Sequence, residues 1–391
     1  MPSSSARLQN LPPYVFAVIG QQLRDMKAQG IDVIRLDIGS PDLPPPDFVV
    51  DALAESARNP SNHGYTGYTG LPAFREAVAR YYKRRFNVDL NPDTEILPLI
   101  GSKEGIVNLS LAILDKGDIS LVPAIGYPSY EMGARIAGAD ICHVEMSSQN
   151  GFLLNVDSLP KEVREKAKLL WVSYPNNPTG TVANLDFYAE MVAFCAENDI
   201  LLASDNPYMQ ITFGDYKAPS ILEIAGAKDV AVEFMSLSKT YNMAGWRIGA
   251  AVGSAVALKH LLAVKSNMDS GHFRAVYEAG VAALDNTPEE WIKERNQVYV
   301  TRRDKIMAAL PEMGLSADLP LATLYIWAKV QDMDATEYAT RCRAEAHVSI
   351  APGEAYGPSG DGYVRMSLGV ANDRLDEALN RMKTWYKSIK S

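Results

Sequence analysis

The sequence predicts an α/β protein with a mostly parallel central sheet and a second, smaller α+β part. The middle of the chain alternates short apolar runs with helical patterns, which is typical of parallel strands joined by crossover helices. Beyond about residue 280, strand-like runs and helices follow in a different arrangement. The length of 391 residues exceeds one small domain and suits a large domain with a smaller companion.

The central strands are expected from their apolar runs. We predict strands at 96–100, 119–122, 169–174, 200–204 and 232–236. A helix is expected over 102–114, because Ile106, Leu109 and Ile113 share one helical face.

The smaller part is predicted to open with a capped helix. Thr287 suits the N-cap, Pro288 the first helical position, and Glu290 the closing position of a capping box. Strands are expected at 324–330, 347–351 and 363–368. A last helix carries Leu375, Leu379, Met382, Tyr386 and Ile389 on one face. We therefore predict a large domain at 46–280 and a small domain made of 1–45 and 281–391.

Composition excludes several function classes. The formal net charge of −9 disfavours nucleic-acid binding, which needs a basic footprint. No apolar run approaches the roughly 20 residues that span a bilayer, and the first residues lack the apolar core of a secretory signal. Three scattered cysteines (Cys142, Cys195, Cys342) favour the reducing cytoplasm. The five histidines show no metal-ligand spacing, so no metal site is expected.

Polar motifs follow the ends of four predicted strands, where ligands of open α/β sheets bind. Gly101, Ser102 and Lys103 open a helix whose free N–H groups suit an anion, although the motif is not a P-loop. By itself this glycine turn is more often a simple strand–helix connection. The segment 174–180, Tyr-Pro-Asn-Asn-Pro-Thr-Gly, forces an irregular loop.

The other two strand ends supply an acid and an amine. Asp205 directly follows an apolar strand, where a carboxylate needs a cationic partner, either a structural one or a ligand nitrogen. Ser236, Ser238 and Lys239, with Arg247 beyond them, are able to hold a phosphate and present an amine. Together the four motifs provide an anion cradle, an acid, an amine and aromatic rings, which match pyridoxal 5'-phosphate.

The same motifs resemble those of fold-type I, class I/II aminotransferases along nearly the whole chain. Ser-Leu-Ser-Lys-Thr-Tyr-Asn-Met-Ala-Gly-Trp-Arg-Ile-Gly (236–249) matches the family's lysine motif, and 177–180 and 205–208 match its other hallmarks. Within the family the chain is most similar to bacterial LL-diaminopimelate aminotransferases, through segments 11–16, 42–44, 174–180, 211–213, 216–220, 236–249 and 265–271. It departs from their pattern at Met209, Gln210 and Arg274. The resemblance implies the three-layer, aspartate-aminotransferase-like fold of pyridoxal-phosphate transferases.

The resemblance also implies the residues that hold the cofactor. Lys239 is expected to form the Schiff base and to move the α-proton, and Asp205 to pair with the ring nitrogen. Tyr208 and Asn177 are expected at the ring oxygen, and Tyr127 on the ring face. The expected phosphate ligands are Ser102, Lys103, Ser236, Ser238, Arg247 and, from the neighbouring subunit, Tyr65, with Tyr68 as its alternative.

Substrate contacts are implied in the same way. Arg365 is expected to bind the α-carboxylate, which a guanidinium grips as a fork, assisted by the N–H of Gly39 and by Asn177. Tyr14 and Asn267 are candidates for the distal end of the substrate, with Asn267 contributed by the partner of a homodimer.

The implied function is ping-pong transamination between an L-amino acid, LL-diaminopimelate in the first place, and 2-oxoglutarate, as in lysine biosynthesis. Aspartate, alanine or aromatic donors are alternatives, because specificity depends on a few distal contacts. A carbon–sulfur β-lyase would use the same lysine, aspartate and arginine. A non-catalytic binding protein of the same fold is disfavoured, since every type of cofactor contact is present. The sequence leaves open whether the Asn177–Pro178 bond is cis.

Overall fold

The computed structural model describes residues 2–9 and 11–391 and contains a seven-stranded central sheet. Its strand order is β2-β8-β7-β6-β5-β3-β4. The strands are β2 (Ile96–Leu99), β3 (Ile119–Pro123), β4 (Asp140–Val144), β5 (Ala167–Val172), β6 (Leu201–Asp205), β7 (Ala231–Ser236) and β8 (Gly249–Gly253). Only β8 runs antiparallel to its neighbours, β2 and β7, among these pairings. The carboxyl ends of β2, β5, β6 and β7 therefore lie at one edge of the sheet.

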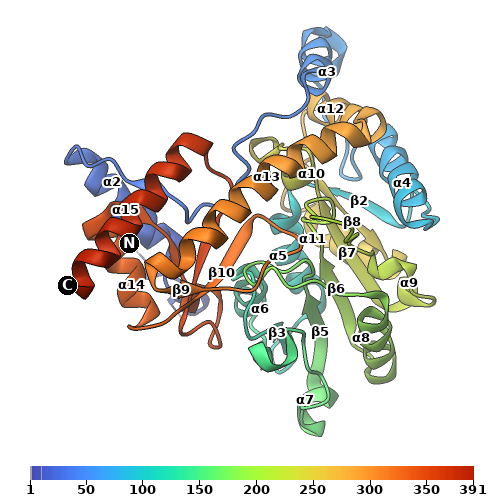
Figure 1. The fold of residues 1–391 in the computed structure, drawn as a ribbon. Coiled ribbons are helices and arrows are strands. Elements are labelled where there is room, and N and C mark those ends of the chain that lie inside the picture. The colour runs from blue at the N-terminus through green and yellow to red at the C-terminus, as the bar shows by residue number, and fades with distance from the viewer. Residues whose placement is uncertain (1, 10) are drawn as a thin grey trace.

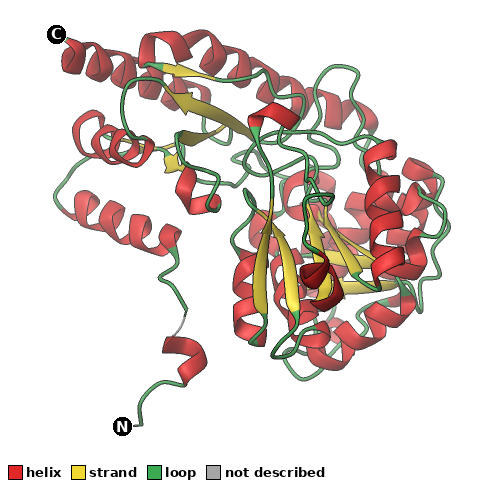
Figure 2. Cartoon of the chain, turned by 90° about the horizontal axis from the view of Figure 1, so that it is seen from below, coloured by secondary structure: helices red, strands yellow, loops and turns green. Residues whose placement is uncertain are grey.

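Helices cover both faces of this sheet, giving three layers (Figure 2). One apolar cluster includes α4 (Pro72–Phe86), α8 (Leu185–Asn198) and α12 (Arg274–Asn286). The opposite cluster includes α5 (Ser102–Ile113), α6 (Ser129–Ala137) and α11 (Ala255–Lys265). The predicted three-layer fold with a mostly parallel sheet is confirmed.

Strand β5 shows how the sequence specifies the two faces. Leu170 and Val172 belong to one apolar cluster, whereas Leu169 and Trp171 belong to the other. Side chains of a strand alternate between faces, so a continuous apolar run fills both layers. All four side chains are fully buried, and each contributes roughly 1.5–3 kcal/mol by leaving water.

A smaller sheet forms from the last third of the chain, in the order β12-β13-β10-β9. Its strands are β9 (Leu315–Ser316), β10 (Tyr325–Val330), β12 (Ala351–Pro352) and β13 (Tyr363–Ser367). Beside it, β1 (Ile34–Arg35) pairs in parallel with β11 (Val348–Ser349). The surrounding helices are α13 (Glu289–Ala309), α14 (Ala335–Arg341) and α15 (Asn372–Lys390). The division into domains at 46–280 and at 1–45 with 281–391 stays a prediction, which the separate sheets support.

Six further α-helices complete the described part of the chain. They are α1 (Ala6–Gln9), α2 (Val15–Ala28), α3 (Asp47–Arg58), α7 (Lys161–Lys166), α9 (Ala227–Val230) and α10 (Leu237–Thr240). Helix α13 runs from the smaller sheet towards α10 and the large sheet (Figure 1). Over the described residues, none of the helices is sufficiently long and apolar to span a membrane.

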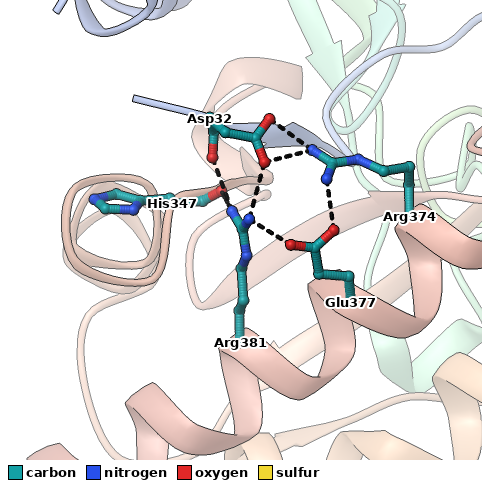
Figure 3. Close-up of polar contacts among 5 residues, drawn as sticks. All are labelled: Asp32, His347, Arg374, Glu377 and Arg381. Carbon is teal, nitrogen blue, oxygen red and sulfur yellow. Dashed lines mark hydrogen bonds and ion pairs between the residues drawn. The ribbon is translucent and has the colours of Figure 1, made fainter. Parts of the chain in front are cut away.

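A polar network joins α15 to the short β1–β11 pair (Figure 3). The Asp32 carboxylate accepts hydrogen bonds from Arg374 at 2.7 Å and from Arg381 at 2.9 Å. Glu377, on the same helix, pairs with both arginines. Arg381 also donates to the Asp32 carbonyl at 2.8 Å, so the network fixes the chain just before β1.

Two local predictions are wrong. Thr287 does not cap α13, because its hydroxyl donates to the Ala283 carbonyl at 2.7 Å and so closes the preceding helix α12. The N-cap of α13 is Pro288, with no side-chain cap. The expected strand at 347–351 is two short strands, β11 and β12, which pair with different partners.

Candidate active site

A cavity of about 410 Å³ lies at the carboxyl edge of the large sheet, against the smaller one. It collects all but two of the predicted site residues, although they are dispersed along the sequence. The predicted residues that line it are Tyr14, Gly39, Ser102, Lys103, Tyr127, Asn177, Asp205, Tyr208, Ser236, Ser238, Lys239, Arg247 and Arg365.

Lys239 lies in the short helix α10, directly after β7, and is partly buried at the cavity. Its ammonium donates to the carbonyl of Gly39. Desolvation, together with the positive charges of Arg365 and Arg247, lowers the pKa of Lys239 to about 8. A larger share of this amine is therefore neutral and nucleophilic at physiological pH than in an ordinary lysine.

Asp205, at the end of β6, is a buried carboxyl group with one free oxygen. Tyr130 donates to its Oδ2 at 2.7 Å, whereas Oδ1 has no hydrogen-bond partner among the described residues. Burial raises the pKa of Asp205 to about 7, although the charge of Lys239 acts in the opposite direction. An unpaired buried carboxylate oxygen is costly, so the site fits a ligand that brings an N–H donor, as a pyridinium ring does.

An anion cradle forms where β2 meets α5. Gly101 has φ +75°, and the N–H groups of the first turn of α5 are free of intrahelical partners. A β-carbon at Gly101 would overlap the guanidinium of Arg247, so the glycine makes room for that cation. Ser236 and Ser238 lie at the same cavity, joined by a bond from the Ser238 N–H to the Ser236 hydroxyl at 3.2 Å. These groups fit a phosphate.

Arg365, in the middle of β13, is buried at the far side of the cavity. It donates to the Asn177 side-chain oxygen at 2.8 Å and to the Asp37 carbonyl at 2.7 Å. Its Nε has no partner among the described residues. The guanidinium stacks over Tyr325, 4.0 Å from the ring centroid, and over Tyr356 at 4.8 Å. A desolvated guanidinium with a free donor suits a carboxylate.

Aromatic side chains form the remaining wall. The hydroxyls of Tyr208 and Tyr325 lie 2.7 Å apart, and burial raises the pKa of Tyr208 well above its usual value. The exposed Lys103 ammonium lies 4.8 Å from the ring centroid of Tyr14 and 5.8 Å from that of Tyr127. Lys103 therefore adds a positive charge to those of Lys239, Arg247 and Arg365 in the lining of the cavity.

Two predicted residues, Tyr65 and Asn267, lie outside the cavity. Tyr65 is 92% exposed, and Tyr68, its alternative, is also exposed. The Asn267 side chain is exposed and donates to the Ala263 carbonyl at 2.8 Å. Both were expected to act across a dimer, so their place outside the cavity of their own chain leaves that prediction untested.

Sequence reasoning missed Tyr130, Tyr325, Phe16 and Tyr356 as cavity residues. Tyr130 lies three residues beyond Tyr127 in the motif after β3, on the first turn of α6, and the centroids of the two rings are 5.9 Å apart. Tyr325 begins a strand whose apolar pattern gave no sign that its hydroxyl would meet Tyr208.

Other sequence questions are answered by the structure. The Asn177–Pro178 bond is cis, as is Tyr174–Pro175. Neither Met209 nor Gln210 lines the cavity: the Tyr81 hydroxyl donates to the Met209 sulfur at 3.2 Å, and Gln210 donates to the same hydroxyl at 2.7 Å. Arg274 pairs with Glu278 on α12 at 2.6 Å.

Comparison with known proteins decides the family. The model of the family "Aminotransferase class I and II" matches residues 31–382. The chain belongs to this family. It is a pyridoxal-phosphate-dependent aminotransferase, as the motifs predicted.

Individual relatives agree with the family. The chain is 46% identical to the "LL-diaminopimelate aminotransferase" of Aquifex aeolicus, with 97% of this chain and 98% of the relative covered. It is 44% identical to the protein of the same name from Dehalococcoides mccartyi, strain BAV1, covering 98% and 99%. Among solved structures, apo BacF of Bacillus subtilis superposes with a TM-score of 0.94 at 36% identity, covering 98% of each chain. A probable N-succinyldiaminopimelate aminotransferase of Thermus thermophilus gives 0.88 at 38% identity, covering 95% and 99%.

Proposed function

We propose that this aminotransferase moves the amino group of LL-diaminopimelate to 2-oxoglutarate, through a Schiff base on Lys239 and by ping-pong kinetics. The observation that carries the assignment of the cofactor residues is the pairing, in one cavity, of an amine with lowered pKa and a buried carboxylate oxygen that lacks a partner. The names of the relatives support the choice of donor.

The lysine and the acid have separate tasks. Bound pyridoxal phosphate supplies an aldehyde that condenses with amines and a ring that stores electrons. Lys239 would hold the aldehyde and, as a free amine, would move the proton from the substrate α-carbon to the carbon that carried the aldehyde. Asp205, whose Oδ1 has no partner among the described residues, would pair with the ring nitrogen and so keep the ring electron-poor. The backbone N–H groups of Ser102 and Lys103 would hold the phosphate, together with the side chains of Ser236, Ser238 and Arg247.

Arg365 sets the direction of the substrate. Its free Nε, with the N–H of Gly39 and the side chain of Asn177, orients the α-carboxylate, so that the α-carbon faces the lysine. Because the Lys239 ammonium contacts the Gly39 carbonyl, the amine and the carboxylate site lie next to each other. Both the amino acid and the oxo acid use this site, which is what ping-pong exchange requires.

The positive charge of Lys103 favours substrates with two carboxylates. Lys103 lies over Tyr14 and Tyr127, whereas Arg365 lies over Tyr325 and Tyr356. LL-diaminopimelate and 2-oxoglutarate each carry a second carboxylate, as does aspartate. Alanine and aromatic amino acids have no second carboxylate and therefore make no ion pair with Lys103. Tyr14 contributes a hydroxyl at the same place.

The proposed assembly is a homodimer in the cytoplasm. Tyr65 is available to reach the phosphate of the partner's cofactor, and Asn267 to reach its substrate, because both side chains are exposed. The three cysteines are unpaired, which suits a reducing compartment, and the acidic net charge gives no footprint for nucleic acid.

The first test is the absorption spectrum of the purified protein with added pyridoxal phosphate. We expect a visible band that Lys239→Ala abolishes and that LL-diaminopimelate converts to the pyridoxamine form, with 2-oxoglutarate restoring it. A protein without the band would refute the role of Lys239. Conversion by alanine or phenylalanine but not by LL-diaminopimelate would refute the donor.

A second test addresses Lys103 and the lyase alternative. Lys103→Met keeps the aliphatic stem and should raise KM for LL-diaminopimelate and 2-oxoglutarate roughly tenfold, with a smaller effect on alanine. Pyruvate and ammonia released from a sulfur amino acid without an oxo acid would instead select the carbon–sulfur β-lyase.

A further inference from the structure

Helix α13 carries a buried cation that has no acidic partner. Arg295 is only 3% exposed, and no carboxylate lies within ion-pair distance of it in the part of the chain that the structure describes. Desolvation lowers the pKa of Arg295 to about 10. A buried charge without a counter-ion is costly, so its position demands a reason.

All hydrogen bonds of this guanidinium go to carbonyl oxygens. Its Nη1 donates to the backbone carbonyl of Lys239 at 3.1 Å and to that of Thr240. Its Nη2 donates to the Gln210 carbonyl at 2.7 Å, two residues beyond Tyr208. The neighbouring Asn296 accepts from the guanidinium and donates to the Gln210 carbonyl at 3.0 Å.

The contacts lie at the end of the lysine-bearing helix. Helix α10 has a single turn, Leu237–Thr240, and its last carbonyls have no intrahelical partners. A cation at a helix C-terminus satisfies these carbonyls and their partial negative charge. Arg295 itself does not line the cavity, so it acts through the backbone of Lys239 and not on the ligand.

We propose that Arg295 is a positioning residue: its guanidinium, anchored in the long helix α13, fixes the backbone of Lys239 and thereby the place of the reactive amine in the cavity. The inference rests on the proposed role of Lys239 in the reaction. Helix α13 runs from the smaller sheet to α10, so the lysine is held by an element that extends to the smaller sheet (Figure 1).

A matched control lies on the same helix. Arg303 is also buried and donates to a backbone carbonyl, that of Pro320, at 3.1 Å, but it also pairs with Asp304 at 2.8 Å and does not line the cavity. Arg295→Met and Arg303→Met therefore each remove one buried guanidinium from the same helix, and only the first removes the hydrogen bonds to the carbonyls of α10. Arg295→Lys keeps the positive charge but not the planar guanidinium. It tests the role of Arg295 if Arg295→Met does not fold.

The experiment follows the uptake of pyridoxal phosphate by the apoproteins, as a function of pH. In Arg295→Met we expect uptake to slow about tenfold or more, since misplacing a reactive group by a fraction of an ångström has effects of this size. The pH of half-maximal uptake should rise by about one unit as the amine becomes better solvated. Arg295→Lys should change both quantities in the same direction but less, and Arg303→Met neither.

Amide hydrogen exchange in segment 237–241 of the apoproteins provides a readout that needs no cofactor, and it should accelerate only in the Arg295 variants. Equal uptake and equal pH dependence in the Arg295 and Arg303 variants would overturn the assignment. Wild-type behaviour of Arg295→Lys would overturn it too if Arg295→Met failed to fold. Lys239→Ala separates the two ideas: a visible band that survives this change refutes the role of Lys239 and leaves Arg295 with nothing to position.

Discussion

Asp205→Asn should change the pH dependence of stability in a way that can be calculated. The pKa of this carboxyl group is 3.8 in an exposed state and about 7 in the folded apoprotein. The folded state therefore binds the proton more tightly, and stability falls as pH rises between these two values. The full loss is about 4 kcal/mol, from about three pKa units at 1.36 kcal/mol each.

The assay is urea unfolding of the apoproteins at about pH 5 and about pH 8, where this one group should account for a difference of about 2.5 kcal/mol. Asparagine does not titrate, so the wild-type protein should lose about that much more stability than Asp205→Asn across this range. Other titrating groups cancel when the two proteins are compared. The Tyr130 hydroxyl can donate to a side-chain oxygen of either aspartate or asparagine at position 205, so its hydrogen bond should be kept in both proteins.

The same substitution should impair the enzyme. The amide cannot carry the negative charge that keeps the ring nitrogen protonated, so kcat should fall by roughly 10² or more while the apoprotein becomes more stable at high pH. If the free energies of unfolding of the two apoproteins changed in parallel with pH, the raised pKa assigned to Asp205 would be refuted. The interpretation that burial leaves this carboxyl group without a partner until a ligand binds would be refuted with it.

Three further substitutions or conditions test other parts of the site. Arg365→Lys should raise KM for both the amino acid and the oxo acid roughly thirtyfold, the equivalent of about 2 kcal/mol, with little change in cofactor affinity; steady-state kinetics and cofactor titration measure both. Gly101→Ala and Gly117→Ala should each destabilise the protein by about 1–3 kcal/mol through backbone strain at positive φ. Only Gly101→Ala should also weaken cofactor binding, because its β-carbon would displace the Arg247 guanidinium, whereas position 117 has open space around it. The rate of cofactor uptake by the wild-type apoprotein should rise with pH and level off above about pH 8, because Lys239 is neutral above its lowered pKa; a plateau only near pH 10 would contradict that pKa.

The strand ends explain how much of the site the sequence could predict. Apolar runs place β2, β5, β6 and β7, and each is followed by a polar motif, so parallel topology alone brings Ser102, Asn177, Asp205 and Lys239 to one edge. β8 received no prediction: its small residues, Gly-Ala-Ala-Val-Gly, carry little strand signal, and its place between β2 and β7 depends on pairing.

Contacts between distant segments were harder to foresee. Tyr325 meets Tyr208 only because the segment after β6 pairs, at Thr212, with Ala322 just before β10, and no local pattern encodes that pairing. Thr287 is not the N-cap of α13 because α12 extends to it, and its hydroxyl donates to the Ala283 carbonyl at the end of that helix. The roles of Tyr65 and Asn267 depend on a second subunit, so neither the sequence nor one chain decides them.

The contact between Gly101 and Arg247 has a consequence for how such a protein evolves. A β-carbon at position 101 would meet the guanidinium, so a substitution there would displace Arg247. The backbone at Gly101 also has φ +75° and ψ 151°, a combination that is essentially restricted to glycine. A lineage that lost Arg247 would therefore keep glycine at position 101, since the backbone still demands it. The room for the guanidinium would persist, so a single substitution at position 247 would be enough to restore the proposed phosphate ligand.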